Sequence, residues 1–510
     1  MRKFLPFLKQ EDGTEGPETP RGLFFLSTKT CATLASMQKK ARYITTTLPY
    51  VNADPHVGFA LELVQADALA RYWRLMAKEN DGEVFFNTGT DEHGQKIADK
   101  AKEAGQDVKE YVDHYAGEFQ NLKEALNISY DAFIRTTDEK HIKAAQEIWK
   151  RCAAKGDIYK KKYKGLYCVG CEMFLRDSDM VDGKCPNHPN QVPQEVEEEN
   201  YFFALSKYQD KLLKYLEQDD VIVPEWRREE AIKFVEGGLE DFSISREKAR
   251  LSWGIPVPDD DDQIFYVWFD ALTNYISTLD WPDGENFKKF WEDGETLQMA
   301  GKDQIRFQSI MWQAMLMSAD VKPTDRVLYH GFINSGGQKM SKSLGNVISP
   351  YDLVARYGTD ATRYILLRHV HPFDDSDVTF ERMDEWYTAN LVNGLGNLVA
   401  RILKMSETYG VQYNNETKEN IYLENFQFQQ ATDKIWAEVQ VLDEFIQKEQ
   451  PFKKIKTDEG SAKKDVFFLL SQLSLIATHL QPFMPETSKI IQEAVKANKK
   501  PENLFKRLEE

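Results

Sequence analysis

The chain has 510 residues, which is too long for one compact domain because folded units mostly contain about 100–200 residues. Hydrophobic residues make up 42% of the sequence and aromatic residues 12%, as in ordinary globular proteins. No run of about 18 apolar residues could span a membrane, so we predict a soluble protein without a membrane partner. The formal net charge of −17 disfavours a partner as acidic as nucleic acid. Local basic clusters at residues 160–164 and 453–456 could still meet phosphates, although solvated lysines explain each cluster equally well.

The first 40 residues differ in character from the rest. Residues 9–22 are polar and rich in glycine and proline, so we predict that residues 1–40 form a poorly ordered or non-native extension. Acidic residues near the start argue against an organellar transit peptide, and we therefore expect a cytoplasmic protein. Our hypothesis is that the natural start is Met37, and peptides from residues 1–36 in the native protein would refute it.

From Arg42 onward the sequence shows strand, loop and helix patterns. A β-branched run is followed by the turn residues "PYVNADP" and by apolar residues at helical spacing, and a second such unit begins at residues 83–87. Two such units predict a parallel sheet with ligands at the carboxyl ends of its strands. Similar patterns return only at residues 264–346, and from about residue 380 long helical patterns replace the strands.

The predicted fold class is therefore α/β, with a Rossmann-type nucleotide fold that is split by an inserted domain and followed by an all-helical domain. The sequence between the two halves holds a cysteine cluster and fits no alternation of strands and helices. The predicted boundaries are 41–124 for the first half, 125–250 for the insert, 251–375 for the second half and 376–510 for the helical domain.

Three of the five cysteines lie close together in the predicted insert, which indicates a metal in a reducing compartment rather than a disulfide framework. The strings "CVGC" and "CPNH" give Cys168, Cys171, Cys185 and His188 the paired spacing of a tetrahedral zinc site. All four positions are protein ligands, so we predict one structural zinc ion with no open coordination position. Three plain thiols and a surface histidine are the alternative.

Two motifs indicate bound phosphate. His56 and Gly58 lie where the first loop enters its helix, so the imidazole, the backbone N–H groups and the positive end of the helix dipole would face a phosphate. The string "KMSKS" puts Lys339 and Lys342 after a Gly-Gly turn, where two ammonium groups suit the charge that develops on a leaving diphosphate. Taken singly, these residues would be a helix cap and two solvated lysines, but their combination with a split α/β pattern is specific.

These motifs belong to a longer ordered series. Its strongest stretches are "TLPYVNADPHVG", "TGTDEHG", "YCVGCE", "ENYFFALSKY", "FYVWFDA", "GKD" with "IRF", and "HGFINSGGQKMSKSLGNVI". The chain thereby resembles the class I aminoacyl-tRNA synthetases, whose hallmarks are a "HIGH" sequence in the first half of a Rossmann fold and "KMSKS" after the second. Among these it is similar to the methionyl-tRNA synthetases, from about Arg42 to Pro485.

The resemblance implies a ligase that uses ATP to convert L-methionine to methionyl-adenylate, releases diphosphate, and transfers the aminoacyl group to tRNA(Met), both elongator and initiator. In such a reaction the protein supplies position and charge stabilisation rather than a covalent nucleophile. Mg²⁺ is expected with ATP. The implied catalytic residues are His56, Lys339 and Lys342. The implied ATP site comprises these three residues with Gly58, Lys302 and Asp303.

The resemblance also implies a methionine pocket, in which Asp91 matches the carboxylate that holds the substrate ammonium. The positions around the methionine side chain are Leu48, Tyr50, Trp268, Ala271, Tyr275 and Gln308. Aromatic edges suit a polarisable thioether, although each aromatic could otherwise be plain core. Leu272 replaces a common proline and Gln308 a usual histidine, and because glutamine can still hydrogen-bond, methionine remains the predicted substrate.

Phe59 departs further from the family, because the second "HIGH" histidine is expected at this position. Loss of a transition-state hydrogen-bond donor lowers a rate by about 10²–10³. The helix terminus, His56, Lys339 and Lys342 all persist, so we predict a working but slowed site rather than an inactive one.

In the helical domain, Asn397 and Arg401 match family positions that read the methionine anticodon, and Phe452 stands at the position of a base-stacking tryptophan. The family carries its zinc in the inserted domain, where it shapes a lid over the acceptor end of the tRNA. The chain stops soon after the helical domain, so we expect no appended dimerisation module and predict a monomer.

Two alternatives remain open. A class I synthetase for leucine, isoleucine or valine would need a larger editing insert than residues 125–250, and the cysteine enzymes bind zinc at the amino acid itself. A tRNA-binding paralogue that has lost adenylation has Phe59 as its only direct support. An ATP–diphosphate exchange assay separates that paralogue from an enzyme.

Overall fold

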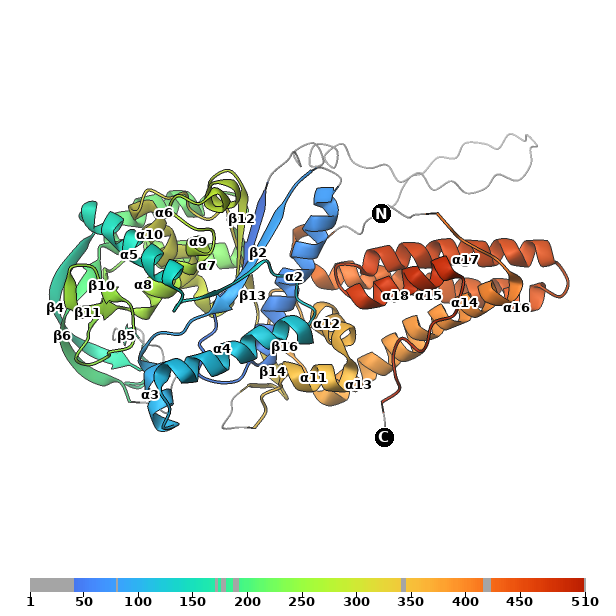
Figure 1. Cartoon of the computed structure of the whole chain (residues 1–510), viewed down its shortest axis with the longest axis horizontal. Helices are drawn as coiled ribbons and strands as arrows, with labels where there is room; N and C mark the ends of the chain where they lie inside the picture. The colour runs from blue at the N-terminus through green and yellow to red at the C-terminus, as the bar shows by residue number, and fades with distance from the viewer. Residues whose placement is uncertain are drawn as a thin grey trace, which may run out of the picture. The chain divides into compact units, whose positions relative to one another are not determined.

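Six parallel strands form the central sheet, in the order β3-β2-β1-β12-β13-β7 (Figure 1). Their bounds are β1 Arg42–Thr45, β2 Val84–Thr90, β3 Ala132–Arg135, β7 Ile222–Val223, β12 Glu295–Gly301 and β13 Arg326–His330. A computed structural model describes residues 41–78, 81–169, 173–175, 180–186, 192–340, 345–415 and 423–508 of the chain.

The order of the strands reverses at β1. The chain passes from β1 to β2 on one side and returns much later to β12 on the other, so that Tyr43 pairs with Phe85 and with Thr296. In open parallel sheets such a reversal opens a crevice at the carboxyl ends of the strands, where ligands bind. The loops that follow β1, β2 and β12 therefore surround the place where a ligand is expected.

Helices pack on both faces of this sheet. Successive strand residues point to opposite faces, so Ile44 joins the core formed with α2 and α4, whereas Tyr43 joins the core formed with α5 and α10. Figure 1 shows α2 and α10 on opposite sides of the strands. The helix bounds are α2 Val57–Lys78, α3 Gln95–Glu103, α4 Val108–Ala125, α5 Glu139–Ala154 and α10 Trp312–Ser318.

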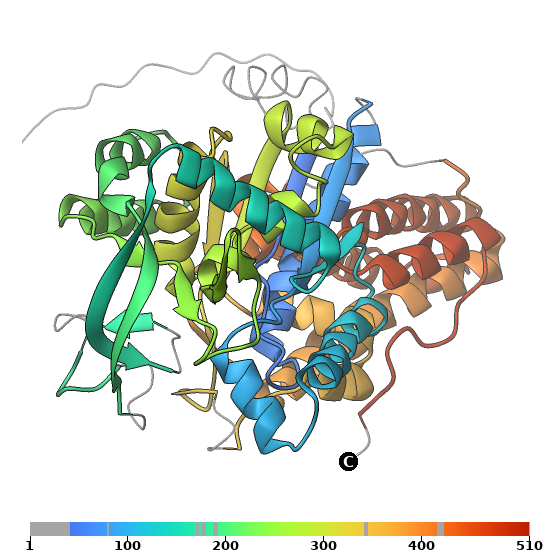
Figure 2. The same ribbon diagram turned by 60° about the vertical axis from the view of Figure 1, so that its left-hand side comes forward.

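Two antiparallel sheets lie in and just after the predicted insert, in the orders β5-β4-β6-β8 and β10-β11-β9. Strands β10 and β11 lie beyond residue 250 and pair with each other and with β9, so this region extends past the predicted boundary. Its longest feature is the twisted ribbon of β4 and β6, drawn in green in Figure 2, which pairs Ile158 with Phe203 at one end. The strand bounds are β4 Ile158–Cys168, β5 Met173–Leu175, β6 Gln194–Phe203, β8 Phe242–Ser243, β9 Ser245–Glu247, β10 Pro256–Val257 and β11 Asp260–Phe265. The helices of this region are α6 Gln209–Leu216 and α7 Glu225–Glu236.

The interpretation of residues 125–250 as lying wholly outside the nucleotide fold differs from the structure in one respect. Strands β3 and β7 come from this range, yet they pair with β2 and β13 of the central sheet. They contain four and two residues, which is too short for a recognisable period in the sequence.

A small fourth sheet of β15, β14 and β16 follows β13 in the sequence. The strand bounds are β14 Ile333–Ser335, β15 Gln338–Lys339 and β16 Ser376–Asp377. The helices α8 Val267–Ala271 and α9 Asn274–Ser277 precede β12, whereas α11 Pro350–Tyr357 and α12 Thr359–Arg368 lie between β15 and β16.

The carboxyl-terminal part is helical (Figure 1). A buried stripe on each helix, including Leu398, Ile435 and Leu469, forms its core. Within the described ranges, no helix has both the length and the apolar character that crossing a bilayer requires. The bounds are α13 Phe380–Trp386, a π-helical segment Tyr387–Gly396, α14 Asn397–Tyr409, α15 Phe428–Glu449, α16 Pro451–Lys454, α17 Glu459–Leu480 and α18 Pro485–Ala497.

A buried ion pair joins the helical part to the Rossmann fold. Arg363 of α12 lies 2.7 Å from the Asp67 carboxylate of α2, and both side chains are fully buried. The same guanidinium donates to the backbone carbonyls of Phe483 and Pro482, at 2.9 and 3.0 Å, between α17 and α18. Burial alone would raise the pKa of Asp67, but Arg363 and its other partners outweigh burial and hold the pKa below its usual value.

Replacing Arg363 by methionine should lower the free energy of unfolding by about 3–5 kcal/mol, because a buried carboxylate and two carbonyls lose their partner. The matched control is Arg382→Met, which removes an ion pair between Asp377 and an arginine that is 55% exposed, and should change stability by less than about 1 kcal/mol. Chemical denaturation measures both variants. A loss at Arg363 no larger than at Arg382 would contradict this account of the joint.

Candidate active site

The loops after β1 and β2 lie side by side at the carboxyl edge of the sheet. The Asp91 amide donates to the Pro49 carbonyl at 3.0 Å, and the Val51 amide donates to the Asp91 carbonyl at 3.2 Å. These bonds place Tyr50 beside Asp91, which is buried with 2% of its surface exposed. Two residues that the sequence predicts for a methionine pocket are thus neighbours in space.

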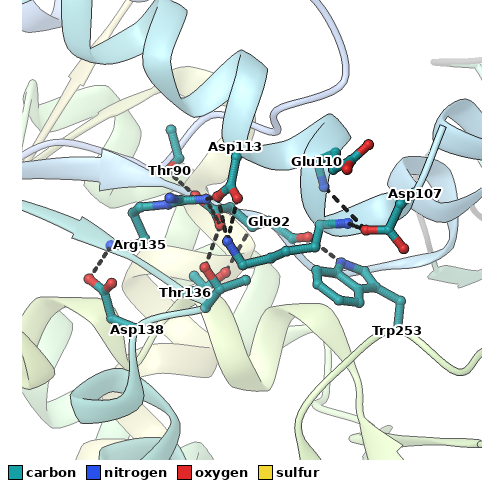
Figure 3. Close-up of polar contacts among 11 residues, drawn as sticks. Thr90, Glu92, Asp107, Glu110, Asp113, Arg135, Thr136, Asp138 and Trp253 are labelled. Carbon is teal, nitrogen blue, oxygen red and sulfur yellow. Dashed lines mark hydrogen bonds and ion pairs between the residues drawn. The ribbon is translucent and has the colours of Figure 1, made fainter.

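The residue after Asp91 is fixed by a dense set of polar contacts (Figure 3). The Glu92 carboxylate is buried and accepts two hydrogen bonds from Arg135 of β3, at 2.6 and 2.8 Å. The hydroxyls of Thr90 and Thr137 donate to the same carboxylate, at 2.7 and 2.5 Å. Bidentate pairing with arginine is among the strongest side-chain contacts in proteins, so the loop at residues 91–93 is rigidly held.

His56 caps the start of α2. The Gly58 amide donates to its Nδ1 atom at 3.0 Å, and the Val57 amide donates to the Ile348 carbonyl at 2.9 Å. A Cβ atom at Gly58 would lie 2.8 Å from the imidazole, so only glycine leaves room for this arrangement. The first amides of α2 are therefore engaged within the protein, and the exposed imidazole is the group that this helix end presents.

Phe59 lies in the first turn of α2, and its side chain points toward α4. It is 9% exposed and packs edge to face on Phe119 of α4, with ring centroids 5.3 Å apart. Its ring belongs to the hydrophobic core between α2 and α4. The side chain at this position therefore packs in the core, a role that the sequence alone does not reveal.

Aromatic rings pack beside the loop that carries Asp91. The rings of Tyr50 and Trp268 meet edge to face at 6.3 Å, and Trp268 stacks on Phe307 at 3.8 Å. The indole Nε1–H of Trp268 is buried and has no hydrogen-bond partner among the described residues. Leu48 is half-buried at the same loop, and Ala271 is buried one turn after Trp268.

Gln308 belongs to a buried, uncharged hydrogen-bond network. Its amide nitrogen donates to the Tyr275 hydroxyl at 2.6 Å, and its amide oxygen accepts from Gln298 at 3.3 Å. Burial raises the pKa of Tyr275, so this phenol stays protonated. Leu272, the other departure from the family, is buried in the core that α5 and α10 share.

Lys302, which directly follows β12, lies next to the Asp375 carboxylate of a later loop. Lys302 pairs with Asp375 at 2.6 Å and lies over the Phe332 ring at 4.7 Å. Burial alone would raise the pKa of Asp375, but Lys302 and the Phe332 amide outweigh burial and hold the pKa below its usual value. Asp303 is exposed, directly after Lys302.

The two lysines of "KMSKS" are only partly described. The backbone of Lys339 belongs to β15 and pairs with Asn334, after a turn in which Gly336 and Gly337 adopt φ of 63° and 74°. Such left-handed residues favour glycine and make a tight hairpin. Lys342 lies in residues 341–344, outside the described residues, and the side chain of Lys339 is not described either.

Two of the four predicted zinc ligands meet in the insert. Cys168 and Cys185 are 2% and 1% exposed and lie in one small cluster with Leu175 and Met180. A tight turn precedes Cys185, in which Asp182 and Gly183 have φ of 52° and 71°. Cys171 and His188 lie outside the described residues. Within the described ranges alone, no group of three or more metal-ligating side chains is present.

In the helical part, Asn397 and Arg401 line a hollow of about 560 Å³. They stand four residues apart on α14 and so share one face of it. The Arg401 guanidinium pairs with the Asp443 carboxylate of α15, a partner that no local sequence signal identifies. Phe452 is 44% exposed on α16 and does not line this hollow.

Two family models match the chain. "tRNA synthetases class I (M)" matches residues 42–193 and 188–403, and "Anticodon binding domain of methionyl tRNA ligase" matches residues 412–509. The methionine–tRNA ligase of Thermotoga maritima is 40% identical over 90% of this chain and 76% of its own length. That of Caldanaerobacter subterraneus subsp. tengcongensis is 41% identical, over 88% and 73%.

Solved structures show the same likeness. Mycobacterium tuberculosis methionyl-tRNA synthetase in complex with methionyl-adenylate superposes with a TM-score of 0.82 at 36% identity, over 92% of this chain and 98% of that one. The free state of the same enzyme gives 0.76 at 32% identity, over 93% and 99%.

Replacing Phe59 by histidine should lower the free energy of unfolding by about 1–3 kcal/mol, because the imidazole would be buried against Phe119 without a partner. Phe59→Leu, which stays apolar, should lose less than about 1.5 kcal/mol. Chemical denaturation compares the two variants. If Phe59→His were as stable as the wild type, the packing described for this position would be wrong.

Proposed function

The chain belongs to the methionyl-tRNA synthetases of class I, and from that premise we propose how its residues divide the work. The protein is a methionine–tRNA ligase, which activates L-methionine with ATP and transfers the methionyl group to tRNA. The main support for these residue roles is that the loops after β1 and β2 lie side by side at the point where the strand order reverses.

Methionine is held at both ends in this proposal. The Asp91 carboxylate, buried at the end of β2, binds the substrate ammonium. Tyr50 and Trp268 contact the thioether with their rings, and Leu48 and Ala271 complete the apolar wall. A buried donor without a partner destabilises a protein, so the Trp268 Nε1–H is suited to a substrate acceptor.

Tyr275 and Gln308 provide the polar contact to the sulfur in this proposal. Gln308 donates to the phenolic oxygen, which leaves the Tyr275 hydroxyl hydrogen to donate elsewhere. A thioether sulfur is a weak acceptor, so such a bond favours methionine over a purely apolar side chain of the same size. Glutamine thus takes over the orienting role of the usual histidine.

ATP, brought as its Mg²⁺ complex, lies in this proposal between the start of α2 and the loop after β12. His56 and the dipole of α2 attract its phosphates, with Gly58 leaving room for the imidazole. Lys302 and Asp303 contact the nucleotide from the β12 side. Lys339 and Lys342 stabilise the diphosphate as it leaves, where charge develops most.

Zinc is the structural ion that we propose for the insert. Two buried cysteines brought together after a tight turn fit a thiolate site, and Cys171 and His188 would complete four ligands. Bound there, the ion would tie together the loops around β4 and β5. No open position is left for catalysis, so the expected contribution is to the fold of the insert.

The hollow on α14 is the site that we propose for the anticodon. Asn397 and Arg401 offer donors and an acceptor to base edges, and Arg401 keeps a fixed direction through Asp443. The exposed ring of Phe452 offers a face on which a base can stack. Elongator and initiator tRNA(Met) share this anticodon, so we propose that both are substrates.

We further propose that the chain acts as a monomer in the cytoplasm, where its tRNA is used. Light scattering should give the mass of one chain, 59.1 kDa, and a dimer mass would contradict the proposal. Recovery of the protein in an organelle fraction would contradict the location.

Methionine-dependent ATP–diphosphate exchange tests the adenylation roles. His56→Ala and Lys342→Ala should each lower the exchange rate by about 10²–10³, because each removes a donor or charge from the phosphates. Arg401→Ala should leave exchange unchanged and lower aminoacylation of tRNA(Met) by about 10–100-fold. The control is Lys404→Ala, a solvent-exposed lysine on the same helix, which should leave both assays unchanged.

The same exchange assay also distinguishes the proposed enzyme from its alternatives. Wild-type protein that binds tRNA but shows no exchange with methionine would be a non-catalytic paralogue. Full exchange in Lys342→Ala would remove this lysine from the proposed mechanism.

Elemental mass spectrometry tests the metal. Purified wild-type protein should contain about one zinc ion per chain, and Cys168→Ser and Cys185→Ser should each lose it. Cys152→Ser is the matched control, since Cys152 is buried in α5 near the Met315 carbonyl, and it should retain the ion. Zinc retained in Cys185→Ser, or absent from the wild type, would rule out the proposed ligands.

A further inference from the structure

A buried carboxylate that has no part in the steps above lies behind the methionine site. Asp270 of α8 is 1% exposed, and a histidine faces each of its oxygens. His93 Nδ1 lies 2.7 Å from Oδ2, and His141 Nε2 lies 2.7 Å from Oδ1. An ionised carboxylate can only accept, so each of these ring nitrogens carries a hydrogen.

Three segments that are far apart in the sequence meet at Asp270. His93 closes the loop at residues 91–93 that carries Asp91, and His141 lies in the first turns of α5. Asp270 itself lies in the same short helix as Trp268. The cluster therefore joins the loop proposed to bind the ammonium to the helix proposed to contact the thioether.

The charge of Asp270 is satisfied within the cluster. Burial alone would raise the pKa of its carboxyl, but His93 and His141 outweigh burial and hold the pKa below its usual value. The Ser277 hydroxyl faces His141 Nδ1 at 2.9 Å, and the Trp253 ring lies 5.5 Å from the His93 ring. Neither Ser277 nor Trp253 is charged. The two histidines are therefore the groups that orient the Asp270 carboxylate.

Besides this cluster, the loop and α8 also meet through Tyr50, which pairs with Asp91 and packs edge to face on Trp268. Glu92 is held by Arg135 and by threonine hydroxyls on the β3 side, whereas Trp268 contacts Tyr50 and Phe307. Asp270 is thus a polar link between the two walls of the pocket. A directed, charge-assisted link fixes distance and angle better than apolar packing does.

We propose that Asp270 is a positioning residue for methionine, which acts through His93 and His141 to hold the Asp91 loop and α8 at the separation that the substrate requires. This inference rests on the proposed roles of Asp91 and Trp268. Misplacement of a binding group by about 1 Å can change an enzymatic rate by about 10²-fold, so the link should affect substrate use strongly.

The test is ATP–diphosphate exchange with methionine and ATP varied in turn. Asp270→Asn keeps the shape of the side chain, but its amide nitrogen would face a histidine N–H, and two donors cannot form a hydrogen bond. The link should therefore break, and the KM for methionine should rise by about 10–100-fold. The KM for ATP should stay near the wild-type value, because the phosphate groups lie at other loops. A purely structural role would not separate the two substrates in this way.

Asp157→Asn is the matched control, since Asp157 is 4% exposed and accepts from Ser318 at 2.8 Å, in contact with none of the proposed site residues. It should leave the KM for methionine unchanged. If Asp270→Asn does not fold, His93→Phe keeps the ring without the N–H donor and should raise the same KM.

Two results would overturn the inference: a KM for methionine unchanged in both Asp270→Asn and His93→Phe, or an equal rise in Asp157→Asn. Asp91→Asn is measured alongside them. If Asp91→Asn leaves the KM for methionine unchanged, the proposed ammonium site itself fails, and that result is distinct from failure of the Asp270 link.

Discussion

The ion pair between Arg135 and the buried Glu92 fixes the loop at residues 91–93, on which the proposed methionine site depends. Two hydrogen bonds from one guanidinium set the direction of the Glu92 carboxylate, and threonine hydroxyls satisfy its remaining lone pairs. Asp91 precedes Glu92 and His93 follows it, so the same anchor places both. If Asp91 binds the substrate ammonium as proposed, its carboxylate is oriented before the substrate arrives, which reduces the entropy lost on binding.

A second buried pair gives the chain its long-range organisation. Arg363 joins Asp67, in the middle of α2, to the turn between α17 and α18. The parts proposed for adenylation and for anticodon recognition therefore share a charged and fully buried joint. Such pairs contribute little net stability but are strongly destabilising when broken, so the joint specifies one arrangement of the two parts.

The sequence predicts the class of fold, and it also predicts a methionine site. The structure brings Tyr50 beside Asp91 and Trp268 against Tyr50, because these residues lie in short motifs at or near strand ends. The sequence does not identify β3 and β7 as strands of the central sheet, since so few residues show no period. Partners such as Asp443 and Asp270 are also missed, because a buried pair across a long sequence separation leaves no local pattern. From the motif, Phe59 is predicted to lack the hydrogen-bond donor that the family has at this position. The sequence does not show that its ring packs on Phe119 in the core.

The central claim is that the methionine site is preformed around Asp91 and is held by its neighbours. A crystal structure of this protein with methionine bound tests that claim most directly. The account predicts that the Asp91 carboxylate lies within hydrogen-bond distance of the substrate ammonium, and that the backbone of residues 91–93 moves by less than about 1 Å. An ammonium held by another group, or a rearranged loop, would contradict it.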